Sequence, residues 1–321
     1  MLAAVAALIS GCTPARDQKA ESVTVAAAPG LDRASIVVAI EKRFFAEQGL
    51  EVTIKPTASG DATVDMVARG EADAGLCASV PFVMAVLDKK DIRILARVYR
   101  SRRYISIVAR KDRGIAHPAD LAGKRIGLVP GATPDYFADL YLGIQGISPA
   151  KYTRVPLSTN QLENALQHGE VDAVAAQHPY SSRLVARLGP QAIEFSDPAI
   201  YQLRVDLVAR PEFSKLRPDA ARRFMLALQN ALNYLRNKPE EAKRLVLEAT
   251  KGDLAIEGGM WEGSDFTLTL DQNLLSAIED EARWALARKG AAHTALPNFL
   301  DFIDARPLQS ARPEAVTMLL P

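Results

Sequence analysis

The feature that most constrains the fold of this chain is an internal repeat with a spacing of roughly 100 residues. An apolar segment that ends in Pro-Gly, a Gln-Gly pair, a Gly-Glu-Xaa-Asp-Ala motif and a proline occur twice in the same order. The pairs lie at 23–30 and 124–131, at 48–49 and 145–146, at 70–74 and 169–173, and at 81 and 179. Four ordered landmarks predict two copies of one supersecondary unit.

Within each copy, hydrophobic periodicity predicts alternating strands and helices. Pro-Gly and Gln-Gly supply the turn and the helix end that separate them. The first copy predicts strands at 23–28, 50–55 and 73–77 and helices at 32–48, 61–68 and from 79 onward; the second predicts strands at 125–129, 152–156 and 172–176 and helices at 134–144, 160–168 and 179–188. This alternation indicates an α/β fold with mostly parallel sheets covered by helices.

The chain of 321 residues is long enough for two domains. Strands are predicted at 92–99, 104–110 and 201–209, and these segments carry the chain to a second lobe and back. We therefore expect two similar doubly wound lobes joined by a two-strand hinge. Lobe 1 would comprise residues 23–103 plus 205–321, lobe 2 residues 104–204, and residues 1–22 a signal and tether.

The first residues resemble a bacterial lipoprotein signal. An apolar run at 1–9 leads to Ser10-Gly11-Cys12, although no Lys or Arg precedes the cysteine. The resemblance implies acylation of Cys12 and a membrane contact through the lipid anchor only, with 13–22 as a tether. A buried N-terminal helix is the alternative. A disulfide between Cys12 and Cys77 is conceivable from the count, but Cys77 lies in an apolar strand typical of a core position.

Composition and motifs exclude several other classes of protein. A net charge of +1 gives no electrostatic case for nucleic acid. No apolar run after residue 12 is long enough for a membrane-spanning helix. The sequence carries no zinc, P-loop, dinucleotide or nucleophile-elbow motif. The spacing of the four histidines does not suggest a metal site, so we expect no cofactor, no metal and a monomer.

The chain resembles periplasmic solute-binding proteins of ABC importers, of the nitrate/sulfonate/taurine type, over about residues 23–290. The resemblance rests on the early Pro-Gly strand end, the paired GEADAG and GEVDAV, DLAGKRIGLVPGATPDYF at 120–137, and the late segment at 260–290. It implies a non-catalytic protein of the bacterial periplasm or cell surface. Its partners would be a small-molecule ligand and the permease and ATPase subunits of an importer.

Topology and resemblance point to the same ligand-binding loops, because ligands bind beyond the carboxyl ends of parallel strands. The expected ligand-binding residues are Gly30, Leu31, Ser59, Gly60, Asp61, Ala78, Ser79, Arg102, Tyr104, Gly131, Ala132, Thr133, Gln177, His178 and Arg204. Ser79 and Thr133 stand at helix starts, where backbone N–H groups can hold an anion. A capping role explains both residues equally well. From the hinge, Arg102, Tyr104 and Arg204 would add charge or stacking.

The ligand itself has two candidates. The resemblance favours a small organic anion such as an aliphatic sulfonate. The alternative is a small heteroaromatic compound such as a thiamine pyrimidine precursor. Family members often carry an aromatic residue where Gln177 and His178 stand, and this departure leaves the ligand open. A synthase of the thiamine pyrimidine type shares the fold, but the cysteine-rich cluster of that enzyme is missing from this sequence. A sensor role is a further alternative to uptake.

Overall fold

The computed structural model describes residues 20–251 and 260–320. The predicted lipidation site Cys12 lies outside these residues. Strand β1 begins at Glu21, so the sheet already includes the last two residues of the predicted tether. Glu21 is held there because its carboxylate accepts hydrogen bonds from Arg217 (2.6 Å), which directly precedes helix α9 (Pro218–Asn237), and from Arg223 (2.7 Å) within that helix.

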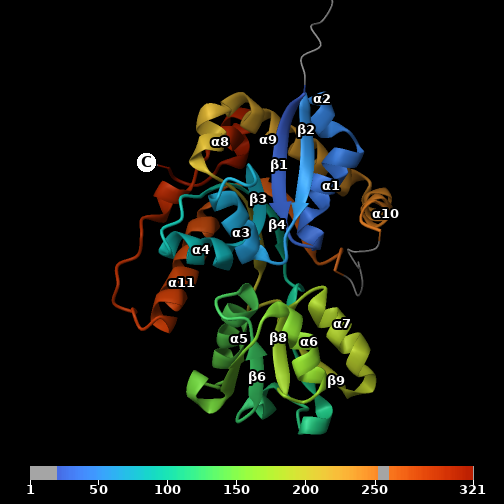
Figure 1. Ribbon diagram of the computed structural model, residues 1–321, viewed down its shortest axis with the longest axis vertical. Helices are drawn as coiled ribbons and strands as arrows, with labels where there is room; N and C mark the ends of the chain where they lie inside the picture. Colours follow the sequence, from blue (N-terminus) through green and yellow to red (C-terminus); the bar gives the residue numbers. More distant parts are fainter. Residues whose placement is uncertain (1–19, 252–259, 321) are drawn as a thin grey trace, which may run out of the picture.

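Two separate sheets form the centres of two lobes (Figure 1). Lobe 1 surrounds the six-stranded sheet, in the order β11-β4-β10-β3-β1-β2. Its strands are β1 Glu21–Ala27, β2 Leu50–Pro56, β3 Ala74–Ala78, β4 Arg93–Ser101, β10 Leu203–Ala209 and β11 Ser264–Thr269. Lobe 2 surrounds the five-stranded sheet, in the order β7-β6-β8-β5-β9. Its strands are β5 Ile105–Arg110, β6 Arg125–Leu128, β7 Thr153–Pro156, β8 Ala173–Gln177 and β9 Ala192–Phe195.

Helices cover the sheets of both lobes (Figure 1). In lobe 1 they are α1 Ala34–Glu41, α2 Phe44–Glu47, α3 Gly60–Ala68, α4 Ser79–Leu87, α8 Pro211–Leu216, α9 Pro218–Asn237, α10 Pro239–Ala249, α11 Gln272–Arg288 and α12 Arg306–Ala311. In lobe 2 they are α5 Thr133–Ile144, α6 Thr159–Gln167 and α7 Tyr180–Leu188. None of the helices in the described part of the chain is long and apolar enough to cross a membrane.

The two copies of the repeat build equivalent parallel units, β2-β1-β3 in lobe 1 and β7-β6-β8 in lobe 2. The expectation of mostly parallel sheets fails outside these units. Strand β10 runs antiparallel to β3 and β4, and β5 runs antiparallel to β8 and β9. The reason is topological: β5 and β10 are the strands by which the chain enters each lobe from the other.

The two segments that connect the lobes, the crossings, lie close to each other. Strand β4 ends in one sheet at Ser101, and β5 begins in the other at Ile105. The return runs from β9, which ends at Phe195, to β10, which begins at Leu203. The α/β fold with two similar lobes and a two-strand connection is therefore confirmed.

The helix expected at 32–48 is interrupted. Arg43 adopts the left-handed conformation (φ 60°), and this splits the segment into α1 and α2. The break turns two neighbouring rings toward α9. Phe45 packs against Phe224 at 4.8 Å between ring centroids, and Phe44 meets Tyr234 at 6.5 Å.

A buried ion pair ties the two strands next to the crossings. The Arg97 guanidinium on β4 donates to the Asp206 carboxylate on β10 at 2.9 Å, and both side chains are almost fully inaccessible to solvent. Removing one member of such a pair leaves a bare buried charge, which costs about 3–5 kcal/mol. The pair therefore fixes the register at the base of the connection between the lobes.

Candidate functional site

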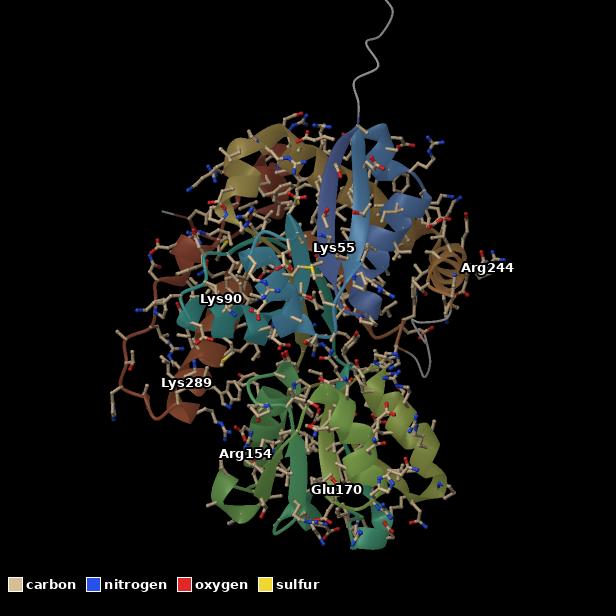
Figure 2. All side chains as sticks on the ribbon, in the orientation of Figure 1. Lys55, Lys90, Arg154, Glu170, Arg244 and Lys289 are labelled. Atoms are coloured by element: carbon tan, nitrogen blue, oxygen red, sulfur yellow. The ribbon has the colours of Figure 1, made fainter. Side chains whose placement is uncertain are left out.

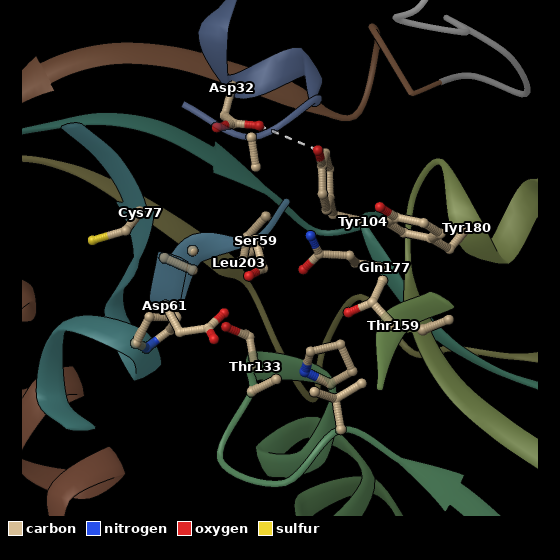
Figure 3. A pocket seen from close by; sticks show the side chains of 18 of the residues that line it. Asp32, Ser59, Asp61, Cys77, Tyr104, Thr133, Thr159, Gln177, Tyr180 and Leu203 are labelled. Atoms are coloured by element: carbon tan, nitrogen blue, oxygen red, sulfur yellow. Dashed lines mark hydrogen bonds between the residues drawn. The ribbon is translucent and has the colours of Figure 1, made fainter. Parts of the chain in front are cut away.

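A pocket lies between the two lobes, where the carboxyl ends of the parallel strands of both sheets face each other (Figure 3). Its lining comprises Ala28, Pro29, Asp32, Ala58, Ser59, Gly60, Asp61, Leu76, Cys77, Ala78, Pro81, Leu203 and Val205 from lobe 1, Val129, Ala132, Thr133, Pro134, Thr159, Leu162, Ala176, Gln177 and Tyr180 from lobe 2, and Tyr104 from the first crossing. The centres of water-sized molecules can occupy about 80 Å³ of it, several times what one water needs. The pocket therefore has room for a small organic molecule.

A carboxylate and a phenol form one wall of the pocket (Figure 3). The Tyr104 hydroxyl donates a hydrogen bond to Asp32 Oδ1 at 3.2 Å. Burial raises the pKa of Asp32 from 3.8 to about 6, and the Tyr104 bond partly opposes that rise. Gly30 makes the pair possible, because a Cβ at that position would lie 2.3 Å from the Tyr104 hydroxyl oxygen. At neutral pH this wall therefore presents a partly desolvated negative charge.

Four helix starts also face the pocket, those of α3, α5, α6 and α7, through Gly60, Thr133, Thr159 and Tyr180. Each contributes about half a positive charge from its free backbone N–H groups. In the first turn of α3, the exposed Asp61 stands at the rim, and its carboxylate points toward Thr133 (Figure 3). The Asp32 and Asp61 carboxylates set negative charge against these partial positive charges. No Lys, Arg or His belongs to the lining among the described residues.

The start of α4 is occupied from within the protein. The buried Ser79 hydroxyl donates to Glu281 Oε1 on α11 at 2.7 Å. Burial raises the pKa of Glu281 from 4.5 to about 7, opposed by the Ser79 hydrogen bond and by Arg204 and Arg97. The chain thus places its own carboxyl group at the helix start where an external anion was expected.

The structure brings eight of the fifteen predicted site residues into the lining of the pocket: Ser59, Gly60, Asp61, Ala78, Tyr104, Ala132, Thr133 and Gln177. The other seven lie outside it: Gly30, Leu31, Ser79, Arg102, Gly131, His178 and Arg204. Gly30 and Ser79 lie next to the lining and support it as described above. For the rest, competing contacts explain their positions.

Both arginines expected at the hinge bind backbone carbonyls instead. Arg102 donates to the Pro198 carbonyl at 3.2 Å, and Arg204 donates to the Gln202 carbonyl at 3.1 Å. Arg204 follows Leu203, which lines the pocket, and alternate residues of a strand point to opposite faces. The expected positive charge is therefore absent from the pocket wall.

His178, Leu31 and Gly131 have structural roles. The buried His178 ring bonds through Nδ1 to the Ser182 hydroxyl at 2.8 Å. Leu31 is buried in the core of lobe 1. Gly131 adopts a left-handed conformation (φ 74°), which makes the turn before α5.

Sequence reasoning did not single out several lining residues, above all Asp32, Thr159, Tyr180, Leu203 and Val205. The first three lie in loops that the sequence predicts to line the cleft, at 29–33, 157–160 and 176–180. Tyr180 follows Pro179, a landmark of the repeat. Leu203 and Val205 carry no such signal, because an apolar strand does not reveal which of its faces meets a cleft.

The cysteine that lines the pocket is held in its protonated form. Burial raises the pKa of the Cys77 thiol well above its ordinary value, and nearby Asp206 and Asp32 add to the rise. A protonated thiol is a poor nucleophile. Among the described residues, no group of three or more His, Cys, Asp or Glu side chains is arranged to hold a metal ion.

Two lobes, two crossings and a pocket between the lobes define the periplasmic-binding-protein fold. The chain belongs to the family described as NMT1/THI5 like, whose model matches residues 31–242. The periplasmic aliphatic sulphonate binding protein SsuA from Escherichia coli has the same fold, with a TM-score of 0.69 and 15% identity over 84% of this chain and 94% of that one.

Two curated relatives have different printed functions. The nitrate/nitrite binding protein NrtA of Nostoc sp. (strain PCC 7120) is 24% identical over 67% of this chain and 54% of its own length. The 4-amino-5-hydroxymethyl-2-methylpyrimidine phosphate synthase THI13 of Saccharomyces cerevisiae is 27% identical over 64% of each chain. The match thus spans between half and two thirds of the length of these relatives.

Proposed function

We propose that this protein is a solute-binding protein that captures one small molecule between its lobes and catalyses no reaction. Loops from both sheets meet in a single pocket, and this observation carries the proposal. A ligand that touches both walls stabilises the closed arrangement of the lobes over the open one. We place lobe 1 at 23–103 plus 205–321 and lobe 2 at 104–204, with two strands of the lobe 1 sheet starting two residues before these bounds, β1 at Glu21 and β10 at Leu203.

The closed form would deliver its ligand to the permease and ATPase subunits of an ABC importer. The binding proteins among the relatives and solved structures support this role. The same names support a location in the bacterial periplasm or at the cell surface. Acylation of Cys12 would hold the protein at a membrane. Fatty-acid labelling of the wild type and of Cys12→Ser tests this anchor, which requires label in the wild type alone.

Of the two ligand classes, the pocket favours the heteroaromatic one. Asp32 and Asp61 repel an anion and accept hydrogen bonds from an amino group or a protonated ring nitrogen. Apolar side chains and the rings of Tyr104 and Tyr180 provide flat walls for an aromatic ring. The synthases among the relatives are named for an aminopyrimidine phosphate as their product. A sulfonate would depend on the helix starts and on neutral donors such as the Thr133 and Thr159 hydroxyls and the Gln177 amide.

A thermal-shift panel tests the ligand class with 4-amino-5-hydroxymethyl-2-methylpyrimidine, ethanesulfonate, taurine and nitrate. We expect the pyrimidine to stabilise the wild type and Asp61→Asn to reduce the shift. The matched control is Asp65→Asn, one turn further along α3, where the carboxylate binds Lys90 outside the pocket. Stabilisation by a sulfonate that increases in Asp61→Asn would overturn the assignment. A panel without any binder would also overturn it.

A further inference from the structure

A second bridge joins the lobes outside the pocket, between α11 and α5. Helix α11 belongs to lobe 1, because it packs on α4 and its Asp271 cap binds Arg100 on β4. Helix α5 belongs to lobe 2, and its first turn lines the pocket through Thr133 and Pro134. Figure 1 shows α11 reaching down from lobe 1 toward α5.

The two oxygens of the Asp139 carboxylate on α5 bind side chains of different lobes. Its Oδ1 accepts hydrogen bonds from lobe 2, from the Tyr152 hydroxyl at 2.6 Å and from Arg154. Its Oδ2 accepts from the other lobe, from Trp284 Nε1 at 2.9 Å, with Arg288 Nη1 at 3.8 Å. Figure 2 shows Arg154 in lobe 2, with Lys289, the residue after Arg288, at the end of α11 nearer to it.

Aromatic rings extend this contact to the return crossing. The Tyr136 ring meets the Trp284 ring edge-on, with 5.2 Å between their centroids. It also meets Tyr201, which precedes β10, at 5.8 Å. Tyr136 and Asp139 follow Thr133 at three-residue intervals along α5. The same rigid helix thus carries both a wall of the pocket and the contact with α11.

We propose that Asp139, Trp284 and Arg288 form an interlobe latch that positions the start of α5 against lobe 1. The latch favours the closed arrangement of the lobes without touching the ligand. Loss of the charge-assisted hydrogen bond from Trp284 and of the ion pair with Arg288 changes the ratio of closed to open lobes by about tenfold. Once the open form is populated, the apparent affinity of the pocket for its ligand falls in proportion to the fraction of molecules in the closed form.

Tryptophan fluorescence tests the latch without a ligand. The chain has two tryptophans, so Trp261→Phe leaves Trp284 as the only reporter. In this background, Asp139→Ala should shift the Trp284 emission to longer wavelength and raise its quenching by acrylamide. The matched control is Arg283→Gln, also on α11, whose partners Glu279 and Asp280 lie on the same helix.

Small-angle X-ray scattering supplies a second readout that does not depend on the reporter. We expect Trp284→Phe to increase the radius of gyration, whereas Trp261→Phe and Arg283→Gln leave it unchanged. If Asp139→Ala does not fold, as judged by circular dichroism, Trp284→Phe alone decides. Quenching and scattering equal to those of the controls would overturn the latch. A failure of the pyrimidine to bind would bear only on the proposed ligand class.

Discussion

The buried carboxyl group of Glu281 gives the sharpest prediction for stability. Its pKa is about 7 in the folded protein, against an ordinary value of 4.5. Because the folded value is the higher one, the folded state holds the proton more tightly. The resulting stabilisation is complete below about pH 4.5 and is lost as the pH rises to about 7. A difference of about 2.5 between the pKa values corresponds to about 3 kcal/mol between pH 4 and pH 8.

Glu281→Gln removes this titration and keeps an oxygen that can accept the Ser79 hydrogen bond. Relative to the wild type, we expect the variant to gain about 3 kcal/mol in free energy of unfolding between pH 4 and pH 8. Urea unfolding at both pH values measures the gain, and Asp280→Asn, an exposed neighbour, serves as the control. If the difference between variant and wild type does not change with pH, or changes in the opposite direction, the reasoning about Glu281 is refuted.

Three further predictions concern the hinge and the pocket. Asp206→Ala leaves the buried Arg97 without its charged partner and should lower the free energy of unfolding by about 3–5 kcal/mol in chemical denaturation. A decrease of less than about 1 kcal/mol would contradict this. Thr133→Ala should weaken binding of 4-amino-5-hydroxymethyl-2-methylpyrimidine in calorimetry, whereas Ser79→Ala should leave it unchanged; the reverse pattern would place the ligand at α4. Ionised Asp32, with its pKa of about 6, should contribute about tenfold more affinity at pH 7 than at pH 5, a change that must disappear in Asp32→Asn.

The repeat predicted the fold well because its signals are local. Turn residues and hydrophobic periodicity within each copy determine the parallel units, and these determine where the strands end. Eight of the predicted residues line the pocket for that reason. Strand β9 at 192–195 was not predicted, because so short a segment lacks a clear alternation.

The missing parts of the site depend on contacts across long stretches of the chain. Glu281 meets Ser79 from 202 residues away, and its helix shows no sequence sign that this carboxylate is buried. Likewise, Arg204 was expected to supply charge, and only the pairing of β10 determines which face of the strand it occupies. The pairing of Asp32 with Tyr104 required the crossing to pass beside the first strand end.

The central claim is that a single ligand is held by both lobes at once. Isothermal titration calorimetry with 4-amino-5-hydroxymethyl-2-methylpyrimidine tests it most directly, with one variant in each lobe, Asp32→Asn and Gln177→Ala, and Asp65→Asn as the control. We predict one site per chain, an affinity reduced about tenfold by each pocket variant and unchanged in the control. Binding that responds to only one of the two pocket variants, or to neither, would contradict the claim.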